Sequence, residues 1–436
     1  MRRSLYGAAV ALVATGLVGC PPDDPKLTVT VESAEGYDEC SDICVDVSAD
    51  LGLVPASGAG LRMSIDGGEV FRPAGELDDE GVGQACLGPA SPGEYDAQVE
   101  VSFQQRAAIK TTSLSVFPFG HDWGIVKEGA LPDPLPRPAL ARDDEGPVLE
   151  VGLAGGWEAD TVMMPAVAPH DGGYLMLYGG RGDDYQIGAA WSEDGSNFTR
   201  LSDEPVIPAG IDGASWAADS TNGPALVAED GGLTVWFQGA VDQHSAIGAA
   251  RSDDGLSWEL LSIDPVLEPG DEEEWDRGSV AHPTVVAHGG GYEMWYASGA
   301  ADGELRLGHA ISGDGLVWTR YCGNPVFDAL GEGSWEHSST KSPEVWFDGE
   351  LYHLLYSAGG SNTWQVGHAV SVDGLRWARS SDDPVLPPGT DGTWDDGSTL
   401  NAFALAEGED VTIWYSGSPA DPGPAALGRA WVEEWH

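Results

Sequence analysis

Three carboxylates are spaced as groups that could share acid and base chemistry. Asp160 and Asp219 occupy the same offset in two copies of a repeated segment, each three residues after a tryptophan, Trp157 or Trp216. In the fourth copy, Glu344 or, alternatively, Glu336 could act as the acid. Two carboxyl groups flanking a glycosidic bond can act as acid and as base or nucleophile. Asp160, Asp219 and Glu344 are the candidate catalytic groups. The structural alternative for Asp160 and Asp219 is that they cap loop amides, as aspartate does in turns.

A second set of residues differs between the copies, and a ligand without fivefold symmetry would be recognised by such residues. Basic and aromatic members suit an anion or a sugar ring, because Trp offers a flat stacking surface and His, Lys and Arg offer donors. A packed loop aromatic or a neutral stacked His is the alternative in each case. The candidate ligand-binding residues are Asn222, Arg277, His282, Lys341, Asn401, Arg181, His244 and Trp364.

The elements that position these residues come from one repeat. Its tryptophans, Trp157, Trp216, Trp275, Trp335 and Trp394, are spaced by 59, 59, 60 and 59 residues. A proline stands eight residues after each Trp in four copies, and Ala402 takes its place in the fifth. The first four copies then each show four short predicted strands separated by turns, and the fifth copy shows three. Four strands per copy cannot bury both faces of their sheet alone, so five copies predict an all-β, five-bladed β-propeller over residues 118–436.

The fifth copy ends soon after its third predicted strand, so another segment must complete its sheet. His121 to Val126 carries an aromatic residue, Trp123, and Pro147-Val148 follows, as in the fourth strands of the other copies. We therefore predict that residues near 121–127 close the ring and remove an exposed strand edge.

A turn of the form Ser-x-Asp-Gly-x-x-aromatic recurs in four copies, for example from Ser371 to Trp377. Asp and Gly favour a tight turn, and the aromatic residue packs between sheets. The turn resembles the Asp-box of sialidases, which lies away from the active site, so we predict a structural role.

The first 117 residues differ from the repeat. Residues 1–19 have a basic start and a short apolar run, and Leu17-Val18-Gly19-Cys20 resembles the lipobox of bacterial lipoproteins, so Cys20 is the expected lipidation site. Residues 20–26 form the predicted tether. Residues 27–117 contain alternating strands and predict a small immunoglobulin-like β-sandwich. We expect a disulfide between Cys86 and either Cys44 or Cys40.

The formal net charge of -51 bears on partners. Binding to a phosphate backbone requires basic patches, so nucleic acid is not expected as a partner, and the membrane is reached through the lipid on Cys20. The acidic run at 271–274 lacks a spaced calcium-loop pattern, so no metal and no cofactor is predicted, and a structural Ca²⁺ has no sequence support. A monomer in the cell envelope, at the outer membrane, is expected.

The strand Gly291 to Tyr296 and the Ser-x-Asp-Gly turns resemble those of the five-bladed glycoside hydrolase superfamily, which includes arabinanase-, levansucrase- and invertase-like enzymes of families 43, 32 and 130. The resemblance covers residues 120–436. It implies an aspartate before the first repeat proline, where Met164 stands. It also implies a glutamate two residues before a later proline, where Asn222, Ala281 and Lys341 stand. The family's catalytic carboxylates therefore do not carry over.

Two functions remain open on this basis. The first is a surface lipoprotein whose propeller binds a carbohydrate or another cell-surface ligand without catalysis. The second is a glycoside hydrolase or phosphorylase that acts on extracellular polysaccharide through carboxylate acid and base catalysis.

Overall fold

The computed structural model describes eight strands between residues 27 and 117 together with Asp78, and residues 130–436 except 144, 230–231, 243, 273, 289–290, 300–302, 361–362 and 422. The predicted signal peptide, Cys20, the tether and the segment at 121–127 lie outside the described residues. The chain divides into two units, residues 1–126 and 127–436. None of the described helices is long and apolar enough to cross a membrane.

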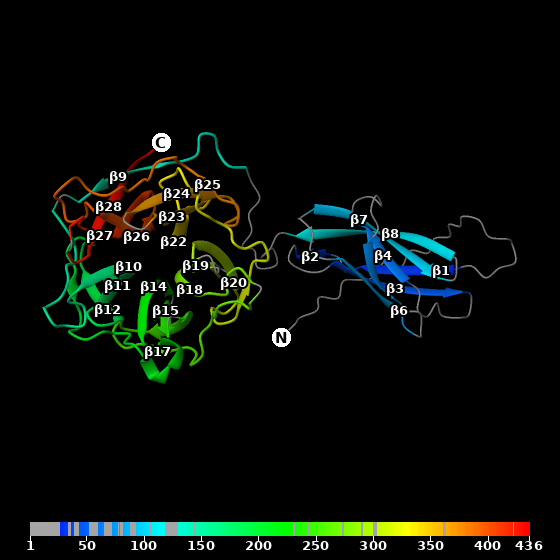
Figure 1. Cartoon of the computed structure of the whole chain (residues 1–436), viewed down its shortest axis with the longest axis horizontal. Coiled ribbons are helices and arrows are strands. Elements are labelled where there is room, and N and C mark those ends of the chain that lie inside the picture. Colours follow the sequence, from blue (N-terminus) through cyan, green and yellow to red (C-terminus); the bar gives the residue numbers. More distant parts are fainter. Residues whose placement is uncertain are drawn as a thin grey trace. The chain divides into compact units, whose positions relative to one another are not determined.

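The first unit consists of two β-sheets (Figure 1). One has the strand order β1-β3-β6 and the other β2-β8-β7-β4-β5. Val47 in the first sheet and Leu61, Val99 and Val101 in the second are buried, which fits two sheets packed on a shared apolar layer. The immunoglobulin-like type stays a prediction. The strands are β1 Leu27–Ser33, β2 Gly36–Asp38, β3 Ile43–Leu51, β4 Gly60–Ser64, β5 Arg72–Glu76, β6 Val82–Leu87, β7 Gly93–Phe103 and β8 Arg106–Phe117.

The cysteines give one register observation in this unit. Strands β3 and β6 are antiparallel, and their register sets Cys44 directly opposite Cys86. The expected disulfide at this position stays a prediction. Cys322, in the second unit, is itself disulfide-bonded, which the sequence did not predict.

The second unit is a five-bladed β-propeller, as predicted. Five four-stranded antiparallel sheets surround one axis, and the first strand of each copy lies innermost (Figure 1). Blade 1 contains β10 Thr161–His170, β11 Gly173–Arg181, β12 Tyr185–Ser192 and β13 Thr199–Arg200. Blade 2 contains β14 Ser220–Glu229, β15 Gly232–Val241, β16 His244–Ser252 and β17 Glu259–Leu260, preceded by the 3₁₀ turns η2 Ile211–Gly213 and η3 Ser215–Ala217. Blade 3 contains β18 Val280–His288, β19 Gly291–Gly299, β20 Leu305–Ser312 and β21 Trp318–Arg320.

The last two blades complete the ring. Blade 4 contains β22 Ser339–Phe347, β23 Tyr352–Gly359, β24 Trp364–Ser371 and β25 Ala378–Arg379. Blade 5 contains β26 Ser398–Glu407, β27 Asp410–Ser418 and β28 Ala426–Trp435, and its outer strand is β9 Pro138–Arg142 from the start of the unit.

The ring is therefore closed by an N-terminal strand, but that strand is β9 and not the segment near 121–127. Strand β9 pairs with β28 so that Arg142 lies opposite Ala430, just as Arg200 lies opposite Ala190 in blade 1. The prediction relied on the aromatic residue Trp123. The feature that blade 5 shares with blades 1, 3 and 4 is instead an arginine in the fourth strand, opposite an alanine of the third strand. The later Pro-Val resemblance was correct, because Leu149 bridges Leu427.

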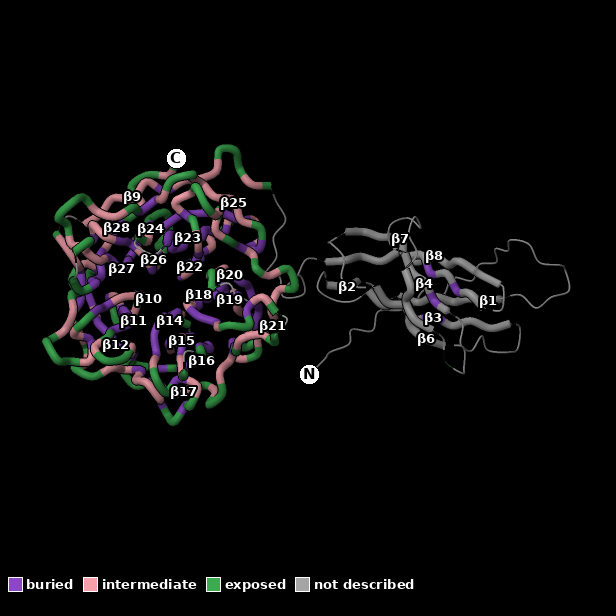
Figure 2. Tube along the Cα trace, viewed as in Figure 1, coloured by how far each residue is buried: buried purple, intermediate pink, exposed green. Residues whose placement is uncertain are grey.

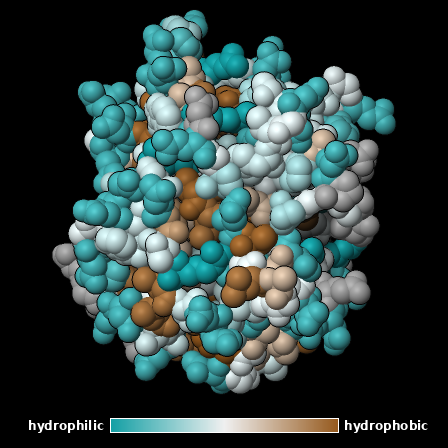
Figure 3. Space-filling model, turned by 90° about the vertical axis from the view of Figure 1, so that its left-hand side faces the viewer, coloured by the Kyte–Doolittle hydropathy of each residue, from teal (hydrophilic) through white to brown (hydrophobic). Residues whose placement is uncertain are grey.

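Apolar side chains fill the spaces between blades, and the exposed residues gather on the outer loops (Figure 2). The largest fully buried side chains are Trp236, Trp295 and Trp414 and the tyrosines and phenylalanine of the second strands. On the outer side drawn in Figure 3, hydrophilic residues cover most of the face and apolar residues show in patches between them. The core thus lies between neighbouring sheets, which is what ties the blades together.

The recurring Ser-x-Asp-Gly turn has the structural role that its pattern predicts. In blade 4, Ser371 Oγ accepts a hydrogen bond from the amide of Gly374 at 2.9 Å. The Asp373 carboxylate accepts hydrogen bonds from the amides of Leu375 and Arg376. Trp295 of blade 3 donates its Nε1–H to the Gly374 carbonyl at 2.8 Å. Trp236 and Trp414 make the same bond to Gly315 and Gly195. Three of the four turns are therefore hydrogen-bonded to a neighbouring blade.

A buried ion pair recurs in four blades. The acidic residue after each repeat Trp accepts hydrogen bonds from a second-strand Tyr and contacts a fourth-strand Arg. In blade 4, Glu336 is fully buried and accepts from Tyr356 at 2.6 Å and from Arg379 Nη2 at 2.6 Å. We call this set the acid–Arg–Tyr cluster. The other members are Glu158–Arg200–Tyr178, Asp276–Arg320–Tyr296 and Asp395–Arg142–Tyr415.

Blade 2 replaces all three members of the cluster together. Ala217, Leu260 and Phe237 occupy the acid, Arg and Tyr positions, and Phe237 and Leu260 belong to one apolar core. Because an ion pair of this kind loses its water on burial, a well-packed apolar set can hold the same position without loss of stability. Losing one partner alone leaves an uncompensated charge, which is costly.

This contrast predicts strong coupling within the cluster. Arg379→Leu alone should lower the free energy of unfolding by about 3–5 kcal/mol, because it leaves the Glu336 carboxylate buried without its cation. The triple change Glu336→Ala, Tyr356→Phe and Arg379→Leu, which copies blade 2, should recover most of that loss. Urea denaturation of the full chain measures both. Arg277→Leu, at an exposed arginine, is the control, and a triple variant less stable than the single one would contradict the prediction.

Candidate functional site

Five β-bulges shape the propeller axis. The innermost strand of each blade slips in register beside its repeat Pro, for example between Met163 and Ala166 and between Lys341 and Glu344. The residue before the Pro, or before Ala402 in blade 5, adopts a left-handed backbone in all five blades. A bulge of this kind turns the strand locally and re-aims its side chains. The five residues are Met164, Gly223, His282, Ser342 and Asn401.

Four of these five residues are not glycine, and this conformation is strained for a residue with a Cβ. The φ values of Met164, His282 and Ser342 are 55°, 49° and 49°. Strain of this kind persists only where the surrounding structure imposes it, and it concentrates at functional sites. The bulge ring is therefore the first place to look for a site.

Two cavities lie along the axis on either side of this ring. The upper cavity has a volume of about 30 Å³, which is room for little more than water, and its lining combines the five bulge residues, the residues that follow them, Glu344 and Phe403. The lower cavity has a volume of about 400 Å³ and is lined by the later residues of the innermost strands. A sugar at the upper end would lie over the bulge ring rather than inside it.

Glu344 lines both cavities. Its side chain is buried, Thr284 Oγ1 donates to its Oε2 at 3.1 Å, and the Ala404 amide donates to its Oε1 at 3.4 Å. Burial raises the pKa of Glu344 to about 8, against the opposing effect of these two hydrogen bonds. The group is therefore a protonated carboxylic acid at neutral pH, which is the form that a general acid needs.

Asp160 and Asp219, the other two candidate catalytic residues, are both exposed and line neither cavity. The Asp219 carboxylate accepts the amide of Asp242 at 2.8 Å, which is the loop-capping role considered as the alternative. Among the residues that line the two cavities, Glu344 alone carries a carboxyl group. The structure thus does not bring the three predicted carboxylates together.

His282 belongs to the upper cavity and has the character of a neutral ring. Burial first, and then the charge of Lys341, lower the pKa of His282 to about 3. Its Nδ1 is buried and has no hydrogen-bond partner among the described residues. A ligand donor could satisfy this nitrogen.

Lys341 and Trp364 form a pair beside the upper cavity. The Lys341 Nζ lies 3.9 Å from the centroid of the Trp364 ring, which is a cation–π contact. No acidic partner of Lys341 is seen in the part of the chain that the structure describes, and burial lowers the pKa of Lys341 to about 8. The pair therefore presents a cation without a counter-ion and a flat aromatic ring.

Three side-chain amides add buried acceptor atoms that have no hydrogen-bond partner among the described residues. Asn401 donates from Nδ2 to Ser342 Oγ at 2.6 Å, and its Oδ1 has no partner among the described residues. The same holds for the Oδ1 of Asn222 and for the Oε1 of Gln238, which lies opposite it on the neighbouring strand. The sequence-based prediction of ligand-binding residues did not include Gln238 or Ser342. The signal for Ser342 was its place before the repeat Pro, which is a bulge position in every blade.

The remaining three predicted ligand residues are exposed, two of them at strand ends and Arg277 on a loop. Arg181 stacks on Tyr185 with its guanidinium 5.1 Å from the ring centroid. Arg277 donates to the Glu272 carbonyl at 2.6 Å, and His244 is exposed at the start of β16. None of these three lines the upper cavity. The site that the structure assembles thus consists of Lys341, Trp364 and the bulge ring.

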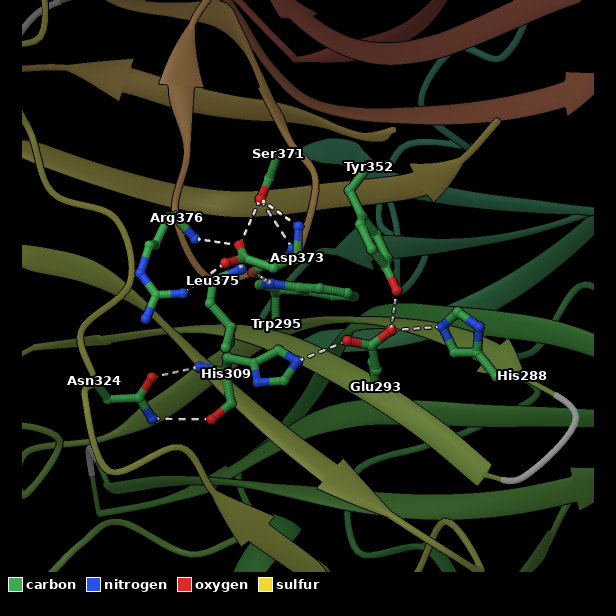
Figure 4. A network of polar contacts seen from close by, with 11 residues as sticks. His288, Glu293, Trp295, His309, Asn324, Tyr352, Ser371, Asp373, Leu375 and Arg376 are labelled. Atoms are coloured by element: carbon green, nitrogen blue, oxygen red, sulfur yellow. Dashed lines mark hydrogen bonds and ion pairs between the residues drawn. The ribbon is translucent and has the colours of Figure 1, made fainter. Parts of the chain in front are cut away.

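A second polar cluster lies between blades 3 and 4 and was not predicted (Figure 4). Glu293 is buried, and its carboxylate contacts His288 Nε2 at 2.5 Å, His309 Nε2 at 3.0 Å and the Tyr352 hydroxyl at 2.7 Å. Burial would raise the pKa of Glu293, but hydrogen bonds from His288 and His309 lower it. The sequence did contain an indication of this cluster. Glu293 occupies a second-strand position at which blade 1 has the apolar residue Leu175. Its residues come from blades 3 and 4, so the cluster joins the two blades, and His288 also lines the lower cavity.

Comparisons with known proteins agree with this architecture. No protein-family model matches the chain. An uncharacterized protein of Mycobacterium tuberculosis is 28% identical over 212 residues, which are 46% of this chain and 68% of that protein. A β-1,2-mannobiose phosphorylase of Thermoanaerobacter sp. is 26% identical over 117 residues, which are 24% of this chain and 38% of the phosphorylase. A crystal structure of a putative glycoside hydrolase from Parabacteroides distasonis matches with a TM-score of 0.56 and 17% identity, over 68% of this chain and 97% of that one.

Glycoside hydrolase structures of families 130, 43 and 117 share this fold as well. The chain therefore has the five-bladed propeller fold of these glycoside hydrolases and phosphorylases. At these identities the likeness establishes the fold, and the activity must be argued from the site.

The raised pKa of Glu344 predicts a pH-dependent stability. Between the ordinary carboxyl range and the folded-state pKa of about 8, the folded chain holds a proton that the unfolded chain releases. Stability from this group is therefore complete at low pH and falls by up to about 1.4 kcal/mol per pH unit through that window. Glu344→Gln should remove this dependence and be more stable than wild type at about pH 8.

Urea denaturation from about pH 5 to about pH 9 checks this prediction. Glu409→Gln, at an exposed glutamate that lines neither cavity, is the matched control and should follow the wild-type curve. Parallel wild-type and Glu344→Gln curves across the range would contradict it.

Proposed function

We propose that the propeller binds a carbohydrate across the upper end of its axis without catalysing its cleavage. The observation that carries the proposal is the Lys341–Trp364 pair beside the bulge ring. The ammonium group lacks a counter-ion among the described residues, and a hydroxyl-rich or acidic sugar would supply acceptors for it while covering the indole ring.

Buried polar atoms without hydrogen-bond partners near the Lys341–Trp364 pair also support carbohydrate binding. His282 Nδ1 and the amide oxygens of Asn222 and Asn401 are buried without partners among the described residues. Buried polar atoms are normally paired, and sugar hydroxyls can donate to all three. A cavity of about 30 Å³ admits no ring, so the sugar would rest on the ring of bulges with its hydroxyls directed inward.

The absence of a second carboxylate supports binding over hydrolysis. Hydrolysis of a glycoside by the common route needs two carboxyl groups within about 5–9.5 Å. Glu344 is the sole carboxyl among the residues that line the axial cavities, and Asp160 and Asp219 are exposed.

A binding experiment tests the proposal. Titration of the full chain with soluble oligosaccharides, β-1,2-linked mannobiose among them, should give saturable heat. Lys341→Ala and Trp364→Ala should each weaken binding about tenfold, because each removes a contact of about 1–2 kcal/mol. Trp431→Ala, at a half-exposed tryptophan of β28, the third strand of blade 5, is the matched control. Wild-type affinity in both site variants would refute the proposal.

The second candidate function is a glycoside hydrolase or phosphorylase, favoured by one observation, the buried carboxyl group of Glu344, whose pKa burial raises. In that function Glu344 donates a proton to the leaving oxygen, and inorganic phosphate held near Lys341 supplies the attacking group in place of a second carboxylate. The same oligosaccharides, analysed for products with and without phosphate, separate the two functions. Turnover that Glu344→Gln abolishes would establish the enzyme, and binding without products would establish the binder.

The proposal also includes the cell envelope as the location, with the chain anchored at the outer membrane through lipid on Cys20. The support is the resemblance of residues 17–20 to a lipobox. Expression of the full chain in a bacterium should give a membrane-associated, acyl-labelled protein. Cys20→Ser should lose both the label and the membrane association, and retention of both would refute the anchor.

A further inference from the structure

We propose that the lower axial cavity is a second ligand site, which binds a small molecule with an apolar body and a primary ammonium group that pairs with Glu344. This site differs from the proposed carbohydrate site, because it lies on the other side of the bulge ring and has only Glu344 and Phe403 in common with the lining of the upper cavity. The inference does not depend on the proposed function.

The size and the walls of the cavity define the body of the ligand. The volume of about 400 Å³ falls in the range of small-molecule sites, roughly 300–1,000 Å³. The wall is built from apolar side chains of all five innermost strands, among them Val167, Leu226, Val285 and Phe403. Such a wall gains free energy from burying an aliphatic or aromatic body, and its polar side chains are few, namely Thr284, His288 and Glu344.

The polar end of the cavity defines the head group. Thr284 Oγ1 and the Ala404 amide each donate to a different oxygen of the Glu344 carboxyl. Two donors suit an ionised carboxylate, and only burial opposes ionisation. A cation placed in the cavity would remove that opposition, because it supplies the missing counter-charge.

The other ionisable residue in the wall is already committed. His288 Nε2 lies 2.5 Å from Glu293, so it belongs to the cluster between blades 3 and 4. No Lys or Arg lines the cavity. An anionic ligand would therefore meet a carboxyl group and no cation, whereas an ammonium would meet a partner. The net charge of -51 also raises the local concentration of cations around the protein.

The test compares three ligands with one shared apolar chain. Calorimetric titration of the full chain with n-hexylammonium, 1-hexanol and hexanoate should give the tightest binding for hexylammonium, by at least about tenfold over hexanol, and the weakest for hexanoate. Glu344→Gln keeps the shape of the side chain but cannot ionise, and it should reduce hexylammonium binding to the level of hexanol. Glu409→Gln, an exposed charge-matched change, should bind as wild type.

Two further variants keep the inference falsifiable. Ala287 lines the cavity at an exposed position, so Ala287→Trp should narrow the mouth without disturbing the core and should weaken all three ligands. Lys341→Ala, which removes the proposed carbohydrate contact, should leave hexylammonium binding unchanged, and this separates the two sites. Equal affinity for hexanol and hexylammonium, wild-type affinity in Glu344→Gln or Ala287→Trp, or no hexylammonium binding would overturn it.

Discussion

The bulge beside the repeat Pro is the constraint on which the rest of this propeller depends. Five innermost strands must approach one axis, and each does so by inserting an extra residue with a left-handed backbone. The resulting ring divides the axial space into an upper and a lower cavity. It also decides which side chains reach the axis. His282, Ser342 and Asn401 are there because they occupy bulge positions, and Glu344 lies below the ring because it follows Pro343.

A second consequence of the blade geometry is that most buried acids are structural. Glu158, Asp276, Glu336 and Asp395 neutralise the arginines of the fourth strands and accept from the second-strand tyrosines. Blade 2 shows that the position tolerates an apolar set in which Ala217 takes the acid's place. A carboxylate near the repeat Trp is therefore a poor indicator of catalysis in this chain. Glu344 differs because no arginine or lysine faces it among the residues lining the cavities.

The two ends of the axis differ in chemistry although they share one ring. The upper end has a small opening, unsatisfied amides and the Lys341–Trp364 pair, which suit a hydroxyl-rich ligand. The lower end is wide and apolar with one carboxyl group, which suits an apolar cation. The chemistry of each end comes from residues that differ between the five copies of the repeat. A symmetric scaffold thus supports two asymmetric sites, because each blade contributes a different side chain at the same backbone position.

The sequence by itself determined the fold, the number of blades and the structural role of the Ser-x-Asp-Gly turn, because these depend on a pattern that repeats every 59 or 60 residues. It also picked out Glu344, His282, Lys341 and Asn401 as departures from that pattern. Only the tertiary structure decided which departures meet at the axis, since equal offsets in two copies put Asp160 and Asp219 on the exposed rim. The closing strand was misplaced for a related reason. Its identity rests on Arg142 reaching Asp395 within blade 5, a contact between parts of the chain that are distant in sequence and that local patterns do not record.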